Sequence, residues 1–310
     1  MKSVRNKTIE LSDSDVGKYL SRCISAGECA QGGDAVCRTV FGDSLEAMRG
    51  IPRASVDLMI ADPYYNLNKS FNSDAFSKMT DSEYERYTRS WIESALPLLK
   101  PTASVYVCCD WRSGMVICRV LGEHLVLRNR ITWQREKGRG ARSNWKNSME
   151  DIWFATVSDK YVFHPERVMM RRRVLAPYRS DGKPRDWEQT DSGRFRNTYP
   201  SNFWDDISVP YWSMAENTPH PAQKPEKLMA KLILASSEEN DIVFDPFLGS
   251  GTVSVVAKKL SRRYIGIERD PFYCALAEYR LSLSETDRRI QGYEDGVFWE
   301  RNSLSGSNKK

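Results

Sequence analysis

Short apolar runs with few polar interruptions recur along the chain. They cover residues 56–61, 103–109, 125–133, 152–157, 242–244 and 264–267. Runs of this length that do not alternate strictly between apolar and polar positions are typical of strands covered on both faces, as in parallel sheets. We therefore expect these six segments to be the buried strands of one sheet.

Helical patterns lie between these runs. Thr80 and Glu83 have the spacing of a capping box, and apolar residues then follow at three- and four-residue steps up to Ala95. Pro225 suits the first turn of a second helix, and another apolar stripe begins at Val253. Strands that alternate with helices at this spacing predict a doubly wound, mostly parallel α/β sheet.

The rhythm breaks between residues 160 and 218, which are rich in Arg, Pro, Asp, Ser and Asn and show little periodicity. We interpret this segment as an irregular insertion that divides the main domain into residues 36–159 and 219–285. Residues 1–35 are expected to form a polar extension. Residues 286–310 are expected to form a tail with a disordered end.

The net charge is only +5, but the basic residues are unevenly placed. Residues 128–146 contain seven Lys and Arg against one Glu, and residues 160–196 contain ten against five acids. Aromatic residues are interleaved with these charges. The mixture is typical of a surface that neutralises phosphates and stacks on bases. A solvated, loop-rich face is the alternative interpretation.

Other features of the chain point to the cytoplasm. No basic segment followed by an apolar run opens the chain, and no stretch of about 18 apolar residues occurs. The seven cysteines include no CxxC pair, so we expect reduced thiols and no metal site.

One apolar run ends in a glycine-rich turn. Residues 242–252 read IVFDPFLGSGT, in which Asp245 closes the strand and Gly249 and Gly251 precede a helix. Glycines are needed where a strand turns sharply into a helix or where a ligand approaches the backbone, although the turn alone could require them. Glu268 ends the next run, at the spacing of an acid that binds ribose hydroxyls. The pattern predicts a nucleoside-containing cofactor.

A second run ends in an acid followed by aromatic residues. Residues 60–71 read IADPYYNLNKSF, and Asp62 closes the strand just before Tyr64 and Tyr65. A carboxylate beside flat aromatic rings suits a planar, polar ligand. Taken alone, Asp62 could equally be a turn former and Tyr65 a core residue.

Three motifs together carry a family resemblance. DPYY at 62–65, HPAQKP at 220–225 and DPFLGSGT at 245–252 occur in this order. They resemble the beta group of DNA amino-methyltransferases that use S-adenosylmethionine, from about residue 42 to about residue 282. Two positions depart from the group's usual motifs, since Tyr64 replaces a proline and Ala222 replaces a threonine. Tyr64 puts the substrate preference in doubt.

The resemblance implies a Rossmann-like methyltransferase fold. Residues 36–159 would form its catalytic half, 219–285 its cofactor-binding half and 160–218 its target-recognition insertion. Asp62 and the Pro63 carbonyl would accept hydrogen bonds from the target amine, and Tyr65 would stack on a base flipped out of the duplex.

The resemblance also implies ligand contacts. The residues expected to bind the cofactor are Gly42, Asp43, Asp62, Gln223, Lys224, Asp245, Phe247, Gly249, Gly251, Thr252 and Glu268. Lys224 is placed near the carboxylate end of the cofactor, and a solvated lysine is the alternative. His220 is expected to be structural. The residues expected to contact DNA phosphates are Arg139, Arg142, Lys146, Arg171, Arg172, Arg173, Arg194 and Arg196.

The implied activity is site-specific methylation of adenine N6 in double-stranded DNA, because an acid-first catalytic box is usually associated with adenine. N4-cytosine methylation, RNA methylation and a DNA-binding regulator without turnover are the alternatives. We expect a prokaryotic or phage protein that works in the cytoplasm at the nucleoid. The sequence leaves open whether it forms a homodimer and whether a cognate restriction endonuclease acts separately.

Overall fold

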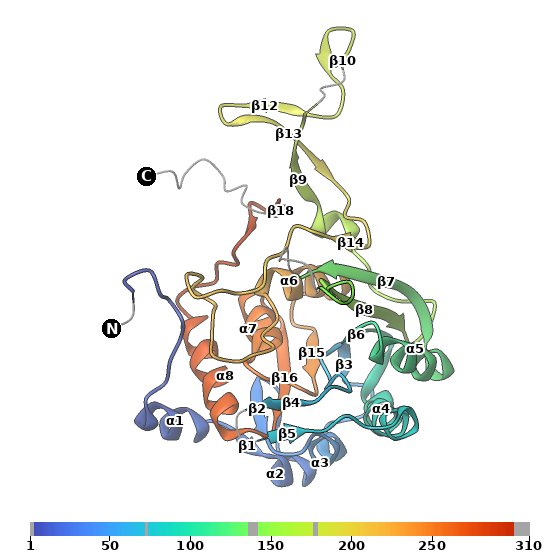
Figure 1. The fold of residues 1–310 in the computed structure, drawn as a ribbon, viewed down its shortest axis with the longest axis vertical. Helices are drawn as coiled ribbons and strands as arrows, with labels where there is room; N and C mark the ends of the chain where they lie inside the picture. Colours follow the sequence, from blue (N-terminus) through green and yellow to red (C-terminus); the bar gives the residue numbers. More distant parts are fainter. Residues whose placement is uncertain (1–2, 72–73, 136–141, 176–178, 301–310) are drawn as a thin grey trace.

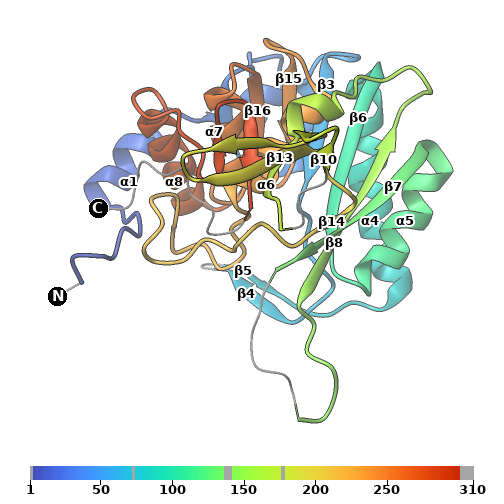
Figure 2. The ribbon, with the colours of Figure 1, turned by 90° about the horizontal axis from the view of Figure 1, so that it is seen from above.

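The computed structural model describes residues 3–71, 74–135, 142–175 and 179–300. A nine-stranded sheet forms its centre (Figures 1 and 2). The strands lie in the order β1 (Ile24–Ser25), β2 (Arg38–Phe41), β16 (Arg263–Glu268), β15 (Ile242–Asp245), β3 (Val56–Ala61), β6 (Leu99–Cys109), β8 (Met149–Thr156), β7 (Val126–Gln134) and β14 (Phe203–Trp204).

The sheet is mostly parallel, as the sequence predicts. Neighbouring strands from β1 to β6 run parallel, β8 is antiparallel to both β6 and β7, and β14 is parallel to β7. All six predicted apolar runs lie in this sheet.

Helices cover both faces of the sheet, which explains the apolar runs. One core contains Met59, Val105 and Cys109 with residues of α2 (Ala26–Ala30), α3 (Ser44–Ala47), α4 (Asp81–Ala95) and α5 (Ser113–His124). The other contains Leu58 and Cys108 with residues of α6 (Glu226–Ser236), α7 (Thr252–Lys259) and α8 (Pro271–Leu283). Successive strand residues therefore face opposite layers, and both faces must be apolar.

The predicted helix starts are present. Thr80 caps α4 in a capping box with Glu83, as its spacing predicts. Pro225 is the residue before α6, and Gly251 is the residue before α7. Asp270 caps α8 by accepting hydrogen bonds from the backbone N–H groups of Phe272 and Tyr273.

A topological switch point lies in the middle of the sheet. β15 and β3 are parallel neighbours, with Val243 opposite Leu58. The chain proceeds from β15 through α7 to β16 on one side, and from β3 through α4 to β6 on the other. Ligands in open α/β sheets bind in the crevice at such a point, outside the carboxyl ends of the strands. Asp245 ends β15, and Asp62 follows β3 directly.

The insertion contains more regular structure than the sequence predicts. β9 (Met170–Arg173), β12 (Glu188–Thr190) and β13 (Gly193–Thr198) belong to a five-stranded sheet, and β10 (Arg179–Ser180) pairs with β11 (Lys183–Pro184). These segments form an arm that projects from the main domain (Figure 1). Their strands are short and polar, so they leave no apolar run in the sequence.

Parts of the predicted extension and tail belong to the folded body. α1 (Asp13–Leu20) packs on α8 through Tyr19 and Tyr279, and Cys29 of α2 is fully buried. In the tail, β17 (Tyr293–Glu294) pairs with β18 (Val297–Trp299), and β18 pairs with β9. Polar composition concealed these contacts, because the apolar residues that form them are scattered among polar ones.

A short hairpin, formed by β4 (Lys69–Phe71) and β5 (Asp74–Phe76), follows the DPYY motif. Within the described ranges, no helix is long and apolar enough to cross a membrane.

Candidate active site

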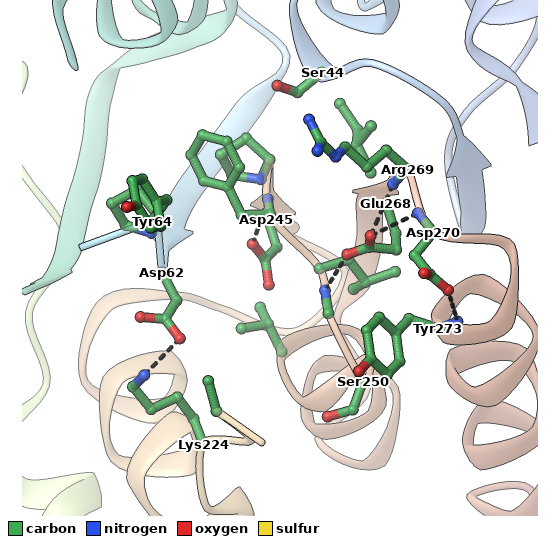
Figure 3. A pocket seen from close by; sticks show the side chains of 18 of the residues that line it. Ser44, Asp62, Tyr64, Lys224, Asp245, Ser250, Glu268, Arg269, Asp270 and Tyr273 are labelled. Atoms are coloured by element: carbon green, nitrogen blue, oxygen red, sulfur yellow. Dashed lines mark hydrogen bonds and ion pairs between the residues drawn. The ribbon is translucent and has the colours of Figure 1, made fainter. Parts of the chain in front are cut away.

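A cavity of about 310 Å³ lies at the switch point, where all three motifs meet (Figure 3). The lining residues include Asp62, Pro63, Tyr64, Tyr65, His220, Ala222, Gln223, Lys224, Asp245, Phe247, Gly249 and Thr252 of the motifs, together with Gly42, Asp43 and Glu268. Residues separated by more than a hundred positions in the sequence therefore share one cavity, of a size that suits a small ligand.

One half of the cavity contains an acid–lysine cluster, formed by Asp62, Tyr65, Glu150 and Lys224. Asp62 Oδ2 accepts a hydrogen bond from Lys224 Nζ at 2.5 Å, and Asp62 Oδ1 accepts one from Tyr65 Oη at 2.6 Å. Lys224 Nζ also lies 3.2 Å from Glu150 Oε2. The Asp62 carboxylate is thus held in place by one cation and one hydroxyl group.

Burial and charge act against each other on Lys224. Burial alone would lower the pKa of its ammonium group, but the carboxylates of Asp62 and Glu150 outweigh burial and hold that pKa above its ordinary value. Burial, followed by the nearby Asp62 charge, raises the pKa of the Tyr65 hydroxyl well above its usual range. Lys224 therefore stays charged and Tyr65 stays a proton donor to Asp62.

Two residues of this half were missed by the sequence prediction. Glu150 is buried, and its Oε1 lies 2.9 Å from Arg135 Nη1 at the end of β7. A signal for Glu150 was present, because Glu150, Ile152 and Phe154 alternate along β8 and the latter two are buried in one core. An acid in register with buried residues indicates a polar site. No comparable pattern marked Arg135.

The other half of the cavity contains the glycine turn and two carboxylates. Asp245 is 3% exposed, and its Oδ1 accepts a hydrogen bond from the Phe247 N–H at 3.0 Å. Glu268 Oε2 accepts one from the Gly249 N–H at 2.8 Å, and Glu268 Oε1 accepts two more from the backbone of Arg269 and Asp270. Within the described ranges, neither Asp245 nor Glu268 forms an ion pair with a lysine or arginine.

Without a neighbouring cation, both acids have a raised pKa. Burial, reinforced by the nearby Asp62 charge, raises the pKa of Asp245 to about 8. Burial also raises the pKa of Glu268, although three backbone N–H groups oppose the shift. This half of the cavity therefore favours a ligand that brings positive charge to Asp245.

Both predicted glycines of the turn have left-handed backbones. Gly249 has φ +53°, and a Cβ there would lie 3.1 Å from His220 Nε2. Gly251 has φ +83°, and a Cβ there would lie 2.7 Å from the Cβ of Ala277. Gly251 does not line the cavity, so its requirement comes from packing between the turn and α8.

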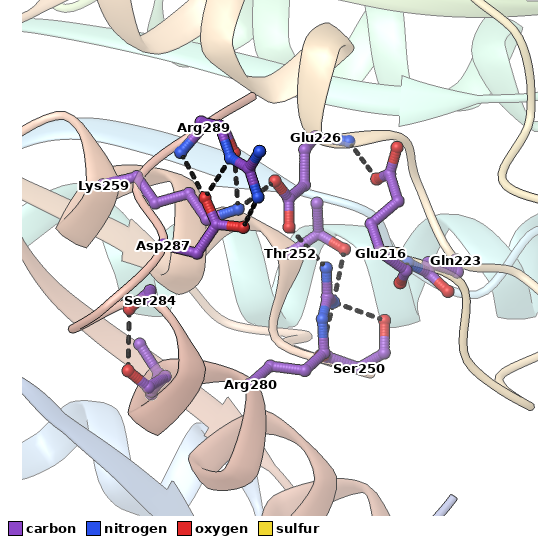
Figure 4. Close-up of polar contacts among 11 residues, drawn as sticks. Glu216, Gln223, Glu226, Ser250, Thr252, Lys259, Arg280, Ser284, Asp287 and Arg289 are labelled. Carbon is purple, nitrogen blue, oxygen red and sulfur yellow. Dashed lines mark hydrogen bonds and ion pairs between the residues drawn. The ribbon is translucent and has the colours of Figure 1, made fainter. Parts of the chain in front are cut away.

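Thr252 and Gln223 use their polar atoms to fix loops (Figure 4). Thr252 Oγ1 accepts a hydrogen bond from Arg280 Nη1 at 3.0 Å, and the same nitrogen donates to the Ser250 carbonyl at 2.8 Å. Gln223 Oε1 accepts from the Thr218 N–H at 2.9 Å, and its Nε2 donates to a backbone carbonyl. These side chains stabilise the backbone that surrounds the cavity.

Three other predicted residues also have defined neighbours. Phe247 packs edge-on against Trp91, with ring centres 5.3 Å apart. Asp43 caps α3 by accepting hydrogen bonds from the N–H groups of Leu45 and Glu46. His220 packs edge-on against Tyr273, with ring centres 4.4 Å apart, and its Nδ1 accepts from the Ala222 N–H.

Tyr64, which departs from the motif, faces the α4 layer. Its ring packs against the core that contains α4, and its hydroxyl donates to the Leu67 carbonyl. Its own carbonyl accepts a hydrogen bond from Tyr84 Oη at 2.8 Å. Tyr64 is therefore held by local contacts, while Asp62 and Tyr65 form the acid–lysine cluster.

The predicted DNA-contacting residues differ in their surroundings. Arg171 is mostly buried, pairs with Glu188 and covers the rings of Phe195 and Trp299, so it stabilises the small sheet. Arg172, Arg173, Arg194 and Arg196 lie on neighbouring strands β9 and β13, with Arg172 opposite Arg196. Arg142 and Lys146 are exposed, and Arg139 lies outside the described residues.

Comparison with known proteins identifies the family. A family model described as DNA methylase, for N6 and N4 methyltransferases, matches residues 56–279. The chain belongs to this DNA methylase family.

Named relatives agree with this assignment. The DNA methylase is 32% identical over 260 residues to the type II methyltransferase M.HpaI of Haemophilus parainfluenzae, covering 83% of this chain and 76% of the relative. It is 30% identical over 285 residues to the DNA adenine methyltransferase YhdJ of Escherichia coli, covering 86% of this chain and 91% of the relative.

Solved structures share the fold. The M1.HpyAVI–SAM complex matches with a TM-score of 0.53 at 25% identity, covering 78% of this chain and 98% of that one. The PvuII DNA methyltransferase, whose title calls it cytosine-N4-specific, matches with a TM-score of 0.60 at 20% identity, covering 78% and 85%. No group of three His, Cys, Asp or Glu side chains in the described part of the DNA methylase could hold a metal ion.

Proposed function

We propose that this DNA methylase transfers a methyl group from S-adenosylmethionine to N6 of an adenine in double-stranded DNA. The observation that carries the proposal is the shared cavity, in which the carboxylate of Asp62 and the glycine turn at Gly249 lie at the ends of adjacent strands. A base held at Asp62 and a cofactor held at the turn would meet there, and such placement can lower a barrier by about 7–11 kcal/mol.

The glycine-turn half suits the cofactor. The buried Asp245 lacks a cation that the ammonium group of S-adenosylmethionine would provide. Glu268 already accepts three backbone hydrogen bonds, which leaves its Oε2 able to accept one more, from a ribose hydroxyl. Gly249 leaves the backbone open to close approach. The cofactor supplies a methyl group on a positively charged sulfur, which is already an activated electrophile.

The acid–lysine cluster suits the target amine. An exocyclic amine is a weak nucleophile because its lone pair is delocalised into the ring, and an acceptor for its N–H groups reduces that delocalisation. The amine nitrogen would bond to the methyl carbon as the bond from that carbon to sulfur breaks, which leaves S-adenosylhomocysteine. The amine would then lose one proton to Asp62 or to water. Asp62 and the Pro63 carbonyl would accept these hydrogen bonds, and Tyr65 would stack on the base. Lys224 and Tyr65 hold the Asp62 carboxylate in place beforehand, so little reorganisation is needed.

Two observations support adenine over cytosine. The catalytic box begins with Asp62, and a relative whose name specifies adenine is 30% identical across 91% of its own length. The N4-cytosine alternative is represented by the PvuII enzyme, but at 20% identity this likeness supports a shared fold only. The arm that bears Arg172, Arg194 and Arg196 would contact the DNA backbone. A homodimer and a separately acting restriction endonuclease stay predictions.

The test uses purified protein, S-adenosylmethionine and defined DNA duplexes, with mass spectrometry of the digested nucleosides. We expect N6-methyladenine, and none with the Asp62→Ala variant. N4-methylcytosine without N6-methyladenine would replace the adenine assignment with the cytosine one. Tight cofactor binding without methylation of any DNA or RNA would indicate a regulator instead.

A further inference from the structure

A tryptophan stands almost fully in solvent on the connection between β7 and β8. Trp145 is 95% exposed, whereas the next most exposed tryptophans of the described chain, Trp111 and Trp212, are 56% and 50% exposed. The Trp145 backbone N–H bonds only to the adjacent Asn144 side chain. An isolated indole in water forgoes a large hydrophobic stabilisation, which a partner with an apolar, planar surface could supply.

The connection that carries Trp145 begins and ends at the cavity. The Arg135 N–H donates to the Ser148 carbonyl at 2.8 Å, which closes the base of the connection. Arg135, which forms that closure, and Glu150, two residues after Ser148, both line the cavity. Figure 2 shows residues 142–148 projecting from the body of the protein, on the side where the β4–β5 hairpin also lies. Trp145 therefore belongs to a projection rooted in the cavity wall.

The neighbours of Trp145 suit nucleic acid. Arg142 and Lys146 are exposed on the same projection and supply positive charge for phosphates. DNA bases present stacking faces for an indole, and proteins that open a duplex insert side chains between base steps. A duplex is the partner that offers anionic phosphates and flat apolar surfaces together.

We propose that Trp145 enters the base stack of the duplex and fills the space left by the extruded target base. The inference rests on the proposed function, because a base must leave the stack before it can reach Asp62. Trp145 would stabilise the opened duplex, while the acid–lysine cluster binds the base itself. Its contribution is therefore largest when the target is stacked and paired, and smallest when the target is already unpaired.

The test compares wild type, Trp145→Ala and Trp145→Phe on duplexes with the modified site found by sequencing methylated DNA. We expect Trp145→Ala to lower kcat/KM on the paired target by roughly 5- to 150-fold, since one aromatic stacking contact is worth about 1–3 kcal/mol. A target opposite an abasic site should restore most of the loss, and Trp145→Phe should retain most activity. With 2-aminopurine at the target, wild type should raise the fluorescence on binding and Trp145→Ala should not.

Trp111→Ala is the matched control, because Trp111 is half exposed and Arg112 lies over its ring. We expect this variant to change kcat/KM by less than about threefold, as is usual for surface substitutions. If Trp145→Ala lowered kcat/KM equally on the paired and the abasic targets, Trp145 would not fill the space in the base stack. It would instead cover the bound base. No loss, or an equal loss in Trp111→Ala, would also overturn the proposal. Wild-type methylation of the paired duplex tests the proposed function separately.

Discussion

The carboxylates in the two halves of the cavity have different partners. In the acid–lysine cluster, Asp62 and Glu150 share the Lys224 ammonium group, and Arg135 pairs with Glu150 from the other side. In the glycine-turn half, Asp245 and Glu268 accept only backbone N–H groups among the contacts of the described chain. The acids of the first half are therefore neutralised by cations of the protein itself, whereas those of the second half are not.

Under the proposed function, this difference would set how the two ligands bind. A neutral base at Asp62 would meet an acceptor that is already fixed by its neighbours, which favours preorganised catalysis. A cationic cofactor at Asp245 would complete a site that lacks positive charge, which favours binding. Substitutions at individual residues test whether the two halves bind different ligands.

The largest expected effect comes from removing the fixed acceptor. Asp62→Asn keeps the shape of the side chain, but it replaces one of the two accepting oxygens with an NH2 donor and removes the negative charge that pairs with Lys224. We expect kcat to fall by about 10³-fold or more, in the range seen when oriented electrostatic groups are removed. Single-turnover methylation measures this fall. Calorimetry should show cofactor Kd changed by less than about threefold. A large rise in cofactor Kd would instead support the sequence prediction that Asp62 also binds the cofactor, and would contradict its assignment to the base alone.

The glycine-turn half should respond to substitution at Gly249. A valine there would have a strained left-handed backbone and a Cβ against His220. We expect cofactor Kd to rise by about 100-fold or more, by analogy with the energetic cost of such strain and blockage. Gly296→Val is the control, because Gly296 has φ +75° with nothing near its Cβ. If cofactor Kd rose equally in both variants, backbone strain alone would explain the weaker binding.

Lys224 contacts both carboxylates of the first half, and Lys224→Met removes the cation that they share. Without the ammonium group, Asp62 and Glu150 would repel each other, and Asp62 would lose one of the two groups that fix its carboxylate. We expect kcat to fall by about 10-fold or more, with cofactor Kd changed by less than about threefold. Lys227→Met is the control, since Lys227 is equally buried but pairs with Asp206. Weakened cofactor binding with an unchanged kcat would return Lys224 to the cofactor site.

Asp245 gives the second half a pH dependence of its own. Its pKa of about 8 lies above the ordinary 3.8, so the folded protein holds a proton that the unfolded chain releases. The free energy of unfolding without cofactor should therefore fall as pH rises from about 4 to 8. A cation must displace that proton, so cofactor affinity should rise toward pH 8, by at most about tenfold per pH unit.

Calorimetry in buffers of different ionisation enthalpy detects that proton. At pH 7 we expect release of up to one proton when the cofactor binds, and none with Asp245→Asn. Proton release that persists in Asp245→Asn would assign it to another group, with Glu268 as the next candidate because its pKa is also raised.

The smallest effect concerns the arm, outside both halves. Replacing Arg172 and Arg173 with glutamine should weaken DNA binding and reduce the slope of log K against log salt by about 2, with cofactor Kd unchanged. Arg171→Gln should instead lower thermal stability, because Arg171 pairs with Glu188 and lies over the rings of Phe195 and Trp299. Cofactor loss in the double variant would contradict the assignment of the arm to DNA.

The sequence predicted what depends on local chemistry. Apolar runs identified the central strands, and the strand-ending Asp62 and Asp245 marked the switch point, because strand ends and glycine turns have local signatures. It could not predict that Lys224 pairs with Asp62, since that contact joins residues 162 positions apart. It also missed the small sheet, whose strands β9 and β18 are short and come from distant segments.

The central claim is that base and cofactor meet in one cavity, and a bisubstrate ligand tests it most directly. The ligand carries adenine linked through N6 to the sulfur position of a cofactor analogue. We expect it to bind at least about tenfold more tightly than S-adenosylhomocysteine, through a second set of contacts worth about 1.4 kcal/mol or more. Asp62→Ala should remove the gain and leave S-adenosylhomocysteine binding intact. Equal affinity of the two ligands for the wild-type protein would contradict the claim.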